Sequence, residues 1–299
     1  MVRRVLLRSG FLALALIAAR ETSPAQIQFT GDVEADFPAG TGIGIVTDNP
    51  IPNPNGPGTI SNSNDVAQAS WMTQAGWTTG WNIKDIRVHY DQTTDSLAVG
   101  VNFFGVAGDS DGNGDPGVAD PRTTQAGGID EAHLGFDPTQ PAHIGESITV
   151  GIDLNGDHKP DIIAGVPADK SQNGPGTNGF TVAQYAPSSA GLAYNYGNPL
   201  NDHNGGLAFD PSAAHPDFEF TIKDFTHLPG FSPSLYAQNG IGLTVFAGTP
   251  FDVVGGEDSI PMVQFAPQAI PEPASLLGWS LAVGAAALAV RARNRRASV

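Results

Sequence analysis

Two short loops place carboxylate and amide oxygens at alternate positions, a spacing that suits a calcium ion. Calcium takes about six to eight oxygen ligands, and alternate residues of a tight loop can converge on one ion. The oxygen-bearing side chains are, in residues 109–120, Asp109, Asp111, Asn113, Asp115 and Asp120, and, in residues 153–161, Asp153, Asn155, Asp157 and Asp161. We therefore predict structural calcium at both loops. The alternative is a pair of solvated acidic turns, because Asp, Asn and Gly are common turn residues.

Both loops resemble calcium loops of known families. The first resembles an EF-hand loop, with Gly114 at its sixth position, but it has Pro116 at the eighth and no flanking helical sequence. The second resembles the Asp-x-Asn-Gly-Asp-Gly-x-x-Asp hairpin of integrin-type extracellular β repeats, with His158 in place of the second glycine. These resemblances imply ions that rigidify loops, which we expect at one rim of the fold.

Apolar and polar residues alternate in the segments around these loops, as they do in β-strands. Residues 83–90 and 97–103 form two such runs around a polar turn, which predicts a β-hairpin. Further strands are expected at residues 42–46, 147–152, 162–166, 218–222 and 241–246, and a connection is expected at residues 194–206. The predicted class is all-β, a two-sheet β-sandwich with long Gly-, Pro- and Asp-rich loops.

The central part of the chain is strongly acidic and contains no cysteine. Six of the 14 Lys and Arg residues and 28 of the 30 Asp and Glu residues fall within residues 26–270, so this region has a formal charge of −22, against −16 for the whole chain. Such a charge repels nucleic acid and attracts divalent cations. Without cysteine the chain can form neither disulfides nor thiolate metal sites. We therefore expect calcium to stabilise the domain, and we exclude nucleic acid as a partner.

Hydrophobic segments at the two ends predict export of a domain that spans residues 26–268. Residues 1–25 combine arginines, an apolar run and small residues, the pattern of a signal peptide for the Sec machinery. In the tail, residues 269–299, an apolar stretch at 274–290 is just long enough for a transmembrane helix. The residues that flank this stretch are Pro271, Glu272 and Pro273 before it and Arg291, Arg293, Arg295 and Arg296 after it. The arginines should hold the far end in the cytoplasm.

This order of Pro-Glu-Pro, short apolar helix and terminal arginines resembles the PEP-CTERM sorting signal of Gram-negative bacteria. The resemblance implies that a membrane-embedded exosortase recognises the tail. It also implies that the helix anchors the protein in the inner membrane, at least transiently, before the protein reaches the cell surface or the biofilm matrix. Exopolysaccharide is then an expected partner. The alternative is a plain single-pass anchor, and both an anchored and a released mature form stay open.

The sequence contains none of the common catalytic motifs, so we predict that the chain is not an enzyme. The alternative is an extracellular polysaccharide hydrolase that uses a carboxylate pair, either Asp217 with Glu219 or Glu257 with Asp258. Residues i and i+2 of a strand share a face, so the first pair could act together. The simpler interpretation places these acids on the solvent side of the strand.

Three tryptophans, Trp71, Trp77 and Trp81, lie close together in the sequence. Their rings could bind a polysaccharide, or they could cap the core at the edge of the sandwich. Residues 81–90 followed by 95–101 are similar to the early strands of carbohydrate-binding sandwiches of the DOMON type. The predicted function is therefore structural, adhesive or polysaccharide-binding, at the cell surface or in the biofilm matrix.

Overall fold

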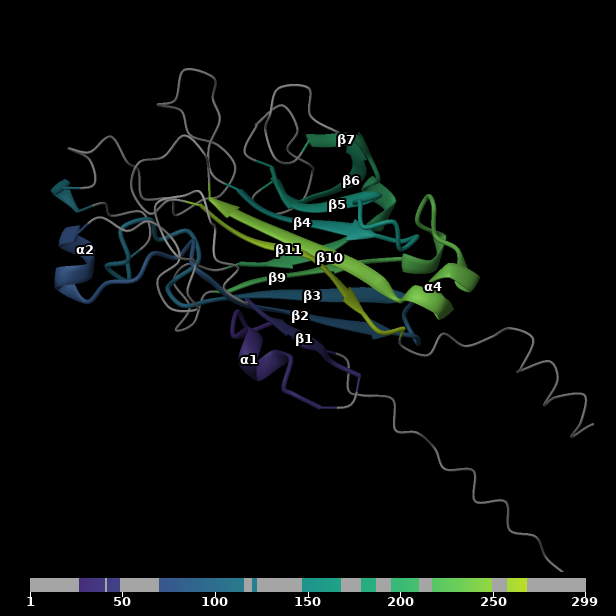
Figure 1. Ribbon diagram of the computed structural model, residues 1–299, viewed down its shortest axis with the longest axis horizontal. Coiled ribbons are helices and arrows are strands. Elements are labelled where there is room, and N and C mark those ends of the chain that lie inside the picture. Colours follow the sequence, from purple (N-terminus) through teal and green to yellow (C-terminus); the bar gives the residue numbers. More distant parts are fainter. Residues whose placement is uncertain are drawn as a thin grey trace, which may run out of the picture.

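Two antiparallel sheets lie face to face in the computed structural model (Figure 1). The structure describes residues 27–40, 42–48, 70–115, 120–122, 147–167, 179–186, 195–209, 217–248 and 257–267. The first sheet has the strand order β1-β2-β3-β9-β8, and the second has the order β11-β10-β4-β5-β6-β7. Every pairing within both sheets is antiparallel. The predicted all-β class is confirmed, and the two sheets form a sandwich.

The elements have the following bounds. The first sheet contains β1 Gly44–Thr47, β2 Ile83–Asp91, β3 Ser96–Phe103, β8 Asn204–Ala208 and β9 Phe218–Ile222. The second contains β4 Ser147–Asp153, β5 Ile162–Val166, β6 Thr181–Ala186, β7 Asn195–Pro199, β10 Ile241–Gly248 and β11 Glu257–Phe265. The helices are α1 Val33–Asp36, α2 Ser70–Ala75 and α4 Pro233–Asn239, with the 3-10 turns η3 Asn201–His203 and η4 Phe225–His227.

The strands with regular alternation are found where the sequence predicts them. The expected hairpin is formed by β2 and β3, with Tyr90 opposite Leu97. Each of the other predicted strands lies within two residues of its expected bounds. Period-2 patterning is reliable here because one face of each strand packs into the core.

Four strands were not predicted, namely β6, β7, β8 and β11. The prediction of a connection at residues 194–206 is wrong, because β7 and part of β8 lie there. Three of the four, β7, β8 and β11, are edge strands. An edge strand pairs on one side only, so it tolerates proline and glycine that would disrupt a central strand. Pro199 ends β7, and Pro261 lies within β11.

The core lies between the sheets and is made of their facing side chains. In β9, Phe218 and Phe220 are fully buried, and the ring of Phe220 lies 5.4 Å from that of Phe180, beside the second sheet. Burial of each such ring contributes about 1.5–3 kcal/mol. With no disulfide in the chain, this apolar layer supplies the main cohesion of the two sheets.

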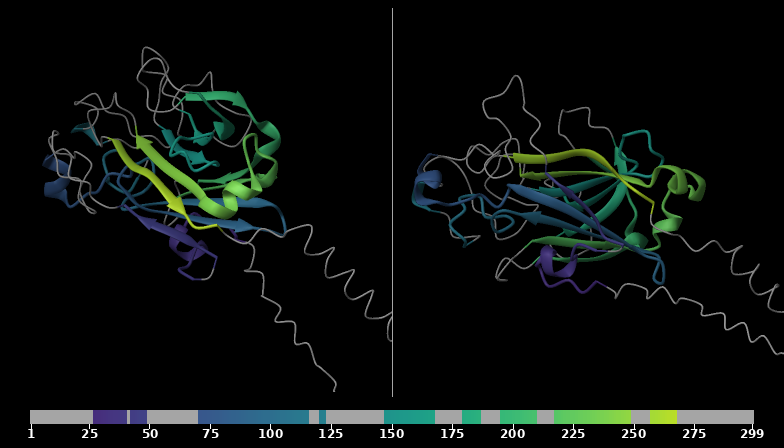
Figure 2. Two further views of the ribbon diagram at one scale, coloured as in Figure 1. Left: turned by 45° about the vertical axis from the view of Figure 1, so that its right-hand side comes forward. Right: turned by 60° about the horizontal axis from the view of Figure 1, so that its bottom comes forward.

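The outer face of the first sheet is covered by the N-terminal segment, because α1 packs against the side away from the second sheet (Figure 2). Val33 and Phe37 are fully buried against Ala98. The polar positions of β2 lie on this outer face, where the N-terminal segment buries His89: it is only 3% exposed, and its Nδ1 lies 2.8 Å from the carbonyl oxygen of Gly42. The alternation was assigned correctly, but the segment that covers this face could not be predicted.

The signal peptide at residues 1–25, the tail at residues 269–299 and its helix at 274–290 lie outside the described residues, so they stay predictions. Among the helices that the structure describes, none is long and apolar enough to cross a membrane.

Replacing Phe220 by Ala should lower the free energy of unfolding by about 3–5 kcal/mol, because it leaves a cavity between the sheets. Phe104→Ala is the matched control: its side chain is 37% exposed, and its loss should cost less than about 1 kcal/mol. Urea unfolding followed by circular dichroism measures both. Equal losses in the two variants would contradict the position of the core described here.

Candidate functional site

The second acidic loop connects β4 to β5 and is built around the fully buried carboxylate of Asp153. Its Oδ1 accepts the backbone N–H groups of Asn155 and Gly156 at 3.0 and 2.7 Å, and its Oδ2 accepts that of His158 at 2.8 Å. Gly156 and His158 have φ angles of 83° and 63°. His158 therefore adopts the left-handed conformation that glycine usually supplies, and the tight turn forms despite its side chain.

Asp161 closes the same loop from its other end. Its Oδ2 accepts the N–H of Leu154 at 2.8 Å, and the Nδ2 of Asn155 donates to both of its oxygens at 3.1 and 3.3 Å. Burial raises the pKa of Asp161, the Leu154 N–H opposes this rise, and the charges of Asp153 and Asp157 add to it. Carboxylates that raise the pKa of a neighbour in this way form a site that a cation would stabilise.

The first acidic loop follows the same plan. The carboxylate of Asp109 is 1% exposed and accepts the N–H groups of Gly112 and Gly114 at 2.7 and 2.6 Å. Asp111 is fully buried and accepts the N–H groups of Asn113 and Asp120 at 3.1 and 2.6 Å. Both loops thus satisfy backbone donors with buried carboxylates and leave further carboxylates around the turn.

The first loop packs against the residues that follow α2. Gly80 donates its N–H to the carbonyl of Asp109 at 2.7 Å, and Trp81 Nε1 donates to Ser110 Oγ at 2.9 Å. Burial raises the pKa of Asp109 to about 6, against the N–H groups of Gly114 and Gly112, which lower it. Protons therefore compete with any cation at this loop in mildly acidic solution.

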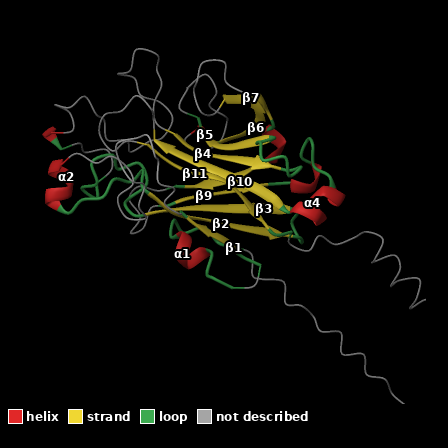
Figure 3. Cartoon of the chain, viewed as in Figure 1, coloured by secondary structure: helices red, strands yellow, loops and turns green. Residues whose placement is uncertain are grey.

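The prediction that both loops lie at one rim of the sandwich is wrong. The second loop lies beside α4, where Asn239 Nδ2 donates to the carbonyl of Asn155 at 3.1 Å. The first lies beside α2, at the opposite end of the sheets (Figure 3). The reason is strand direction: β4 ends where β10 begins, next to α4, whereas β3 begins at that end and finishes at the other. The spacing of residues within each loop does not indicate at which end of the sandwich that loop lies.

A third group of acids was missed by the sequence analysis. Among the described residues, one group of three acid or imidazole side chains has its ligand atoms within 4.8 Å of one another: Asp95, Asp224 and His227. Neither acidic loop has such a group among its described residues. Asp95 accepts the hydroxyls of Tyr90 and Thr226 at 2.9 and 2.7 Å. Burial alone would raise the pKa of Asp95, but these hydrogen bonds together lower it. Asp95 thus joins the β2–β3 turn to η4. The two segments are far apart in the sequence, so no sequence motif could have predicted this contact.

The three tryptophans have different environments. Trp81 is fully buried in the core, so its ring is not available to a polysaccharide. Trp71 and Trp77 are partly buried and meet edge to face, with ring centroids 6.1 Å apart. The guanidinium carbon of Arg122 lies 4.5 Å from the Trp71 centroid and 5.5 Å from that of Trp77, and Arg122 also pairs with Asp120 at 2.7 Å. The end of the first loop is therefore attached to α2.

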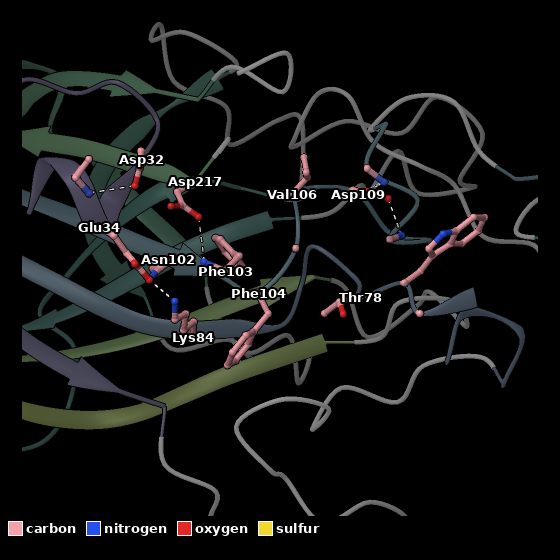
Figure 4. Close-up of a pocket in the computed structure, with 16 residues that line it drawn as sticks. Asp32, Glu34, Thr78, Lys84, Asn102, Phe103, Phe104, Val106, Asp109 and Asp217 are labelled. Carbon is pink, nitrogen blue, oxygen red and sulfur yellow. Dashed lines mark hydrogen bonds and ion pairs between the residues drawn. The ribbon is translucent and has the colours of Figure 1, made fainter. Parts of the chain in front are cut away.

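A cleft of about 750 Å³ lies between α1 and the first acidic loop (Figure 4). Its lining comes from α1, from the segment after α2, from the end of β3 and from the loop itself. Trp77 and Phe104 contribute aromatic surface, and Lys84 and Asn102 contribute polar groups. The cleft therefore brings together one predicted glycan-binding residue, Trp77, and one predicted metal ligand, Asp109.

The carboxylate pair of the hydrolase alternative is not on the solvent side of β9. Asp217 is 6% exposed and Glu219 is fully buried, both under the N-terminal segment. Asp217 accepts the N–H groups of Phe103 and Val33, each at 3.1 Å, and Glu219 Oε2 accepts that of Gly31 at 2.8 Å. Burial raises the pKa of Asp217 to about 7 and that of Glu219 to about 8, although these N–H groups lower both.

These hydrogen bonds explain why the acids are inside: they hold residues 31–33 onto the sheet. Of the second pair, Asp258 is 7% exposed and accepts the N–H of Ile83 at 2.7 Å. The side chain of Glu257 lies outside the described residues.

Residues 144–182 match the family model of the FG-GAP repeat. The match covers β4, the second acidic loop, β5 and the first residues of β6. No curated protein and no solved structure matches the chain.

Folding should become less favourable as the pH rises from about 5 to 8. The pKa of Glu219 rises from 4.5 to about 8 on burial, so the folded chain holds a proton that the unfolded chain releases in this range. The free energy of unfolding should therefore fall by up to about 1.4 kcal/mol for each pH unit in this range. Glu219→Gln keeps an oxygen for the Gly31 N–H and should reduce the pH dependence, although the buried Asp217, whose pKa is raised to about 7, retains a part of it. Urea unfolding in EDTA at several pH values measures the change.

Asp95→Asn is the control for this experiment. The pKa of Asp95 is lowered by its hydrogen bonds, so its contribution is lost only as the pH falls below about 4. Parallel profiles for Glu219→Gln and the unmodified protein between pH 5 and 8 would show that Glu219 does not hold a proton in the fold.

Proposed function

We propose that this chain is an exported, calcium-stabilised protein of the cell surface or biofilm matrix. The β4–β5 hairpin carries the proposal. In it the buried carboxylate of Asp153 accepts three backbone N–H groups, and Asn155, Asp157 and Asp161 lie around the same turn. This hairpin falls within the segment that is similar to the FG-GAP repeat, an extracellular β-structure.

The donors of this loop fit calcium. An ionised carboxylate has about four lone-pair sites, and four hydrogen bonds reach the carboxylate of Asp153. A cation would therefore bind mainly to the oxygens of Asn155, Asp157 and Asp161 around the same turn. The predicted ligands are carboxylate and amide oxygens, which suit calcium better than softer metals. The formal charge of −22 over residues 26–270 favours any divalent cation.

An ion at this loop would stabilise more than the loop itself. Asp153 Oδ2 also accepts a hydrogen bond from Gln264 Nε2 in β11 at 3.2 Å, and Asn239 at the end of α4 donates to the carbonyl of Asn155. The turn therefore contacts β11 and α4 in addition to its own strands. In a chain without cysteine, calcium would take the role that disulfides have in other exported domains.

Calcium should raise the melting temperature of the exported protein above its value in EDTA. For a dissociation constant of about 10⁻⁴ M, about 10 mM calcium adds about 2.7 kcal/mol, or about 5–10 °C in a domain of this size. Asp157→Ala should remove the contribution of the second loop, and Asp111→Ala that of the first. Differential scanning calorimetry in EDTA and in calcium measures each effect.

Asp202→Ala is the matched control, because Asp202 is an exposed acid in η3, outside both loops. It should keep the full calcium-dependent rise. If the unmodified protein shows no rise, or if all three variants rise equally, the acidic loops are solvated turns and the calcium proposal fails.

The export route is part of the proposal and depends on the two ends of the chain. The Pro271-Glu272-Pro273 segment, the apolar stretch 274–290 and the four terminal arginines support recognition by an exosortase after Sec export. Exopolysaccharide is the proposed matrix partner. The location outside the cell agrees with the similarity of residues 144–182 to an extracellular repeat.

Replacing Pro271, Glu272 and Pro273 together by Ala should prevent processing of the tail while leaving export intact. Intact-mass spectrometry of the protein from the host should show loss of the tail in the unmodified protein and its retention in the triple variant. A tail that is retained in both would show a plain membrane anchor instead.

A further inference from the structure

The cleft beside the first acidic loop is lined by a nearly buried side-chain amide, that of Asn102. Asn102 is 3% exposed and lines the cleft. Its Nδ2 donates to Asp85 Oδ2 at 2.9 Å and to Glu34 Oε1 at 3.2 Å. Because only the NH₂ group can donate to two carboxylates, these bonds determine the orientation of the amide. Its Oδ1 accepts no hydrogen bond from the described residues, so a donor from a ligand can bind there.

The charged groups around Asn102 are already paired. Glu34 forms an ion pair with Lys84, and both oxygens of Asp217 and of Asp109 accept backbone N–H groups. The lining contains several carboxyl groups and one lysine, so an anionic ligand is repelled. A neutral ligand is not repelled, and the amide oxygen of Asn102 suits an uncharged hydroxyl.

Aromatic surface completes the cleft. Phe104 is 37% exposed and is the one large apolar residue among those described that is exposed. It lies beside Asn102 and Lys84 in the cleft (Figure 4). Trp77 lines the same cleft, and its position is set by its contacts with Trp71 and Arg122. An exposed aromatic ring next to polar groups is the combination that binds a ligand with both C–H faces and hydroxyls.

We infer that this cleft binds a segment of a neutral polysaccharide. A sugar ring packs its C–H face on Phe104 or Trp77, and one hydroxyl donates to Asn102 Oδ1. The exposed Lys84–Glu34 pair supplies a further donor and acceptor at the rim. This inference deepens the matrix role proposed above by naming a site and a glycan class. It does not depend on calcium at the second loop.

Affinity gel electrophoresis of the exported protein tests the inference, with dextran, mannan, hydroxyethyl cellulose or alginate in the gel. At least one of the three neutral polysaccharides should retard the protein, and anionic alginate should not. Phe104→Ala and Trp77→Ala should each weaken the retardation at least tenfold. Asn102→Ala should weaken it as well, because it removes the free acceptor.

Tyr185→Ala is the matched control, because Tyr185 is a partly buried aromatic residue of β6, in the second sheet, and does not line the cleft; this variant should bind as the unmodified protein does. No retardation by any neutral polysaccharide, retardation by alginate alone, or equal weakening by Tyr185→Ala and Phe104→Ala would each overturn the inference. The calcium-dependent rise in melting temperature should persist in Phe104→Ala, so failure of this site and failure of the calcium proposal are distinguishable.

Discussion

Buried carboxylates that accept backbone N–H groups are the interaction on which the loops of this protein depend. Asp153 and Asp109 each organise an acidic loop in this way, and Asp217 and Glu219 hold the N-terminal segment on the first sheet. Such bonds replace solvent for the charged group and satisfy donors that a tight turn leaves unpaired. They allow a chain with a formal charge of −16 to bring acids inside without a cation from lysine or arginine beside each.

The burial of carboxyl groups makes the fold sensitive to protons under the N-terminal segment and to cations at the first acidic loop. Under the N-terminal segment, Glu219 favours the protonated state, because burial is the main influence on its pKa. At the first loop, burial raises the pKa of Asp109 as well, but Asp111 and the other oxygens lie around it, so a cation can neutralise the cluster instead. Residue type alone does not separate these cases.

The regular strands and the loop between β4 and β5 could be predicted from the sequence, because their signals are local. Alternation identified β2 and β3, and spacing identified Asp153 to Asp161. The edge strands β7, β8 and β11 could not be predicted, since a strand with one neighbour needs no regular pattern. The burial of Glu219, the ion pair of Lys84 with Glu34 and the group around Asp95 depend on contacts between distant segments, which no spacing encodes.

The cleft shows how such contacts couple a local motif to a surface. Gly112 of the first loop packs so closely on Thr78 that a Cβ atom there would lie 2.6 Å from its backbone, and Arg122 links Asp120 to both Trp71 and Trp77. The conformation of the loop therefore determines where Thr78 and Trp77 lie. Whatever neutralises Asp109 and Asp111 also holds one wall of the cleft in place. The first acidic loop is thus one wall of the cleft for which we propose polysaccharide binding, as well as a predicted calcium site.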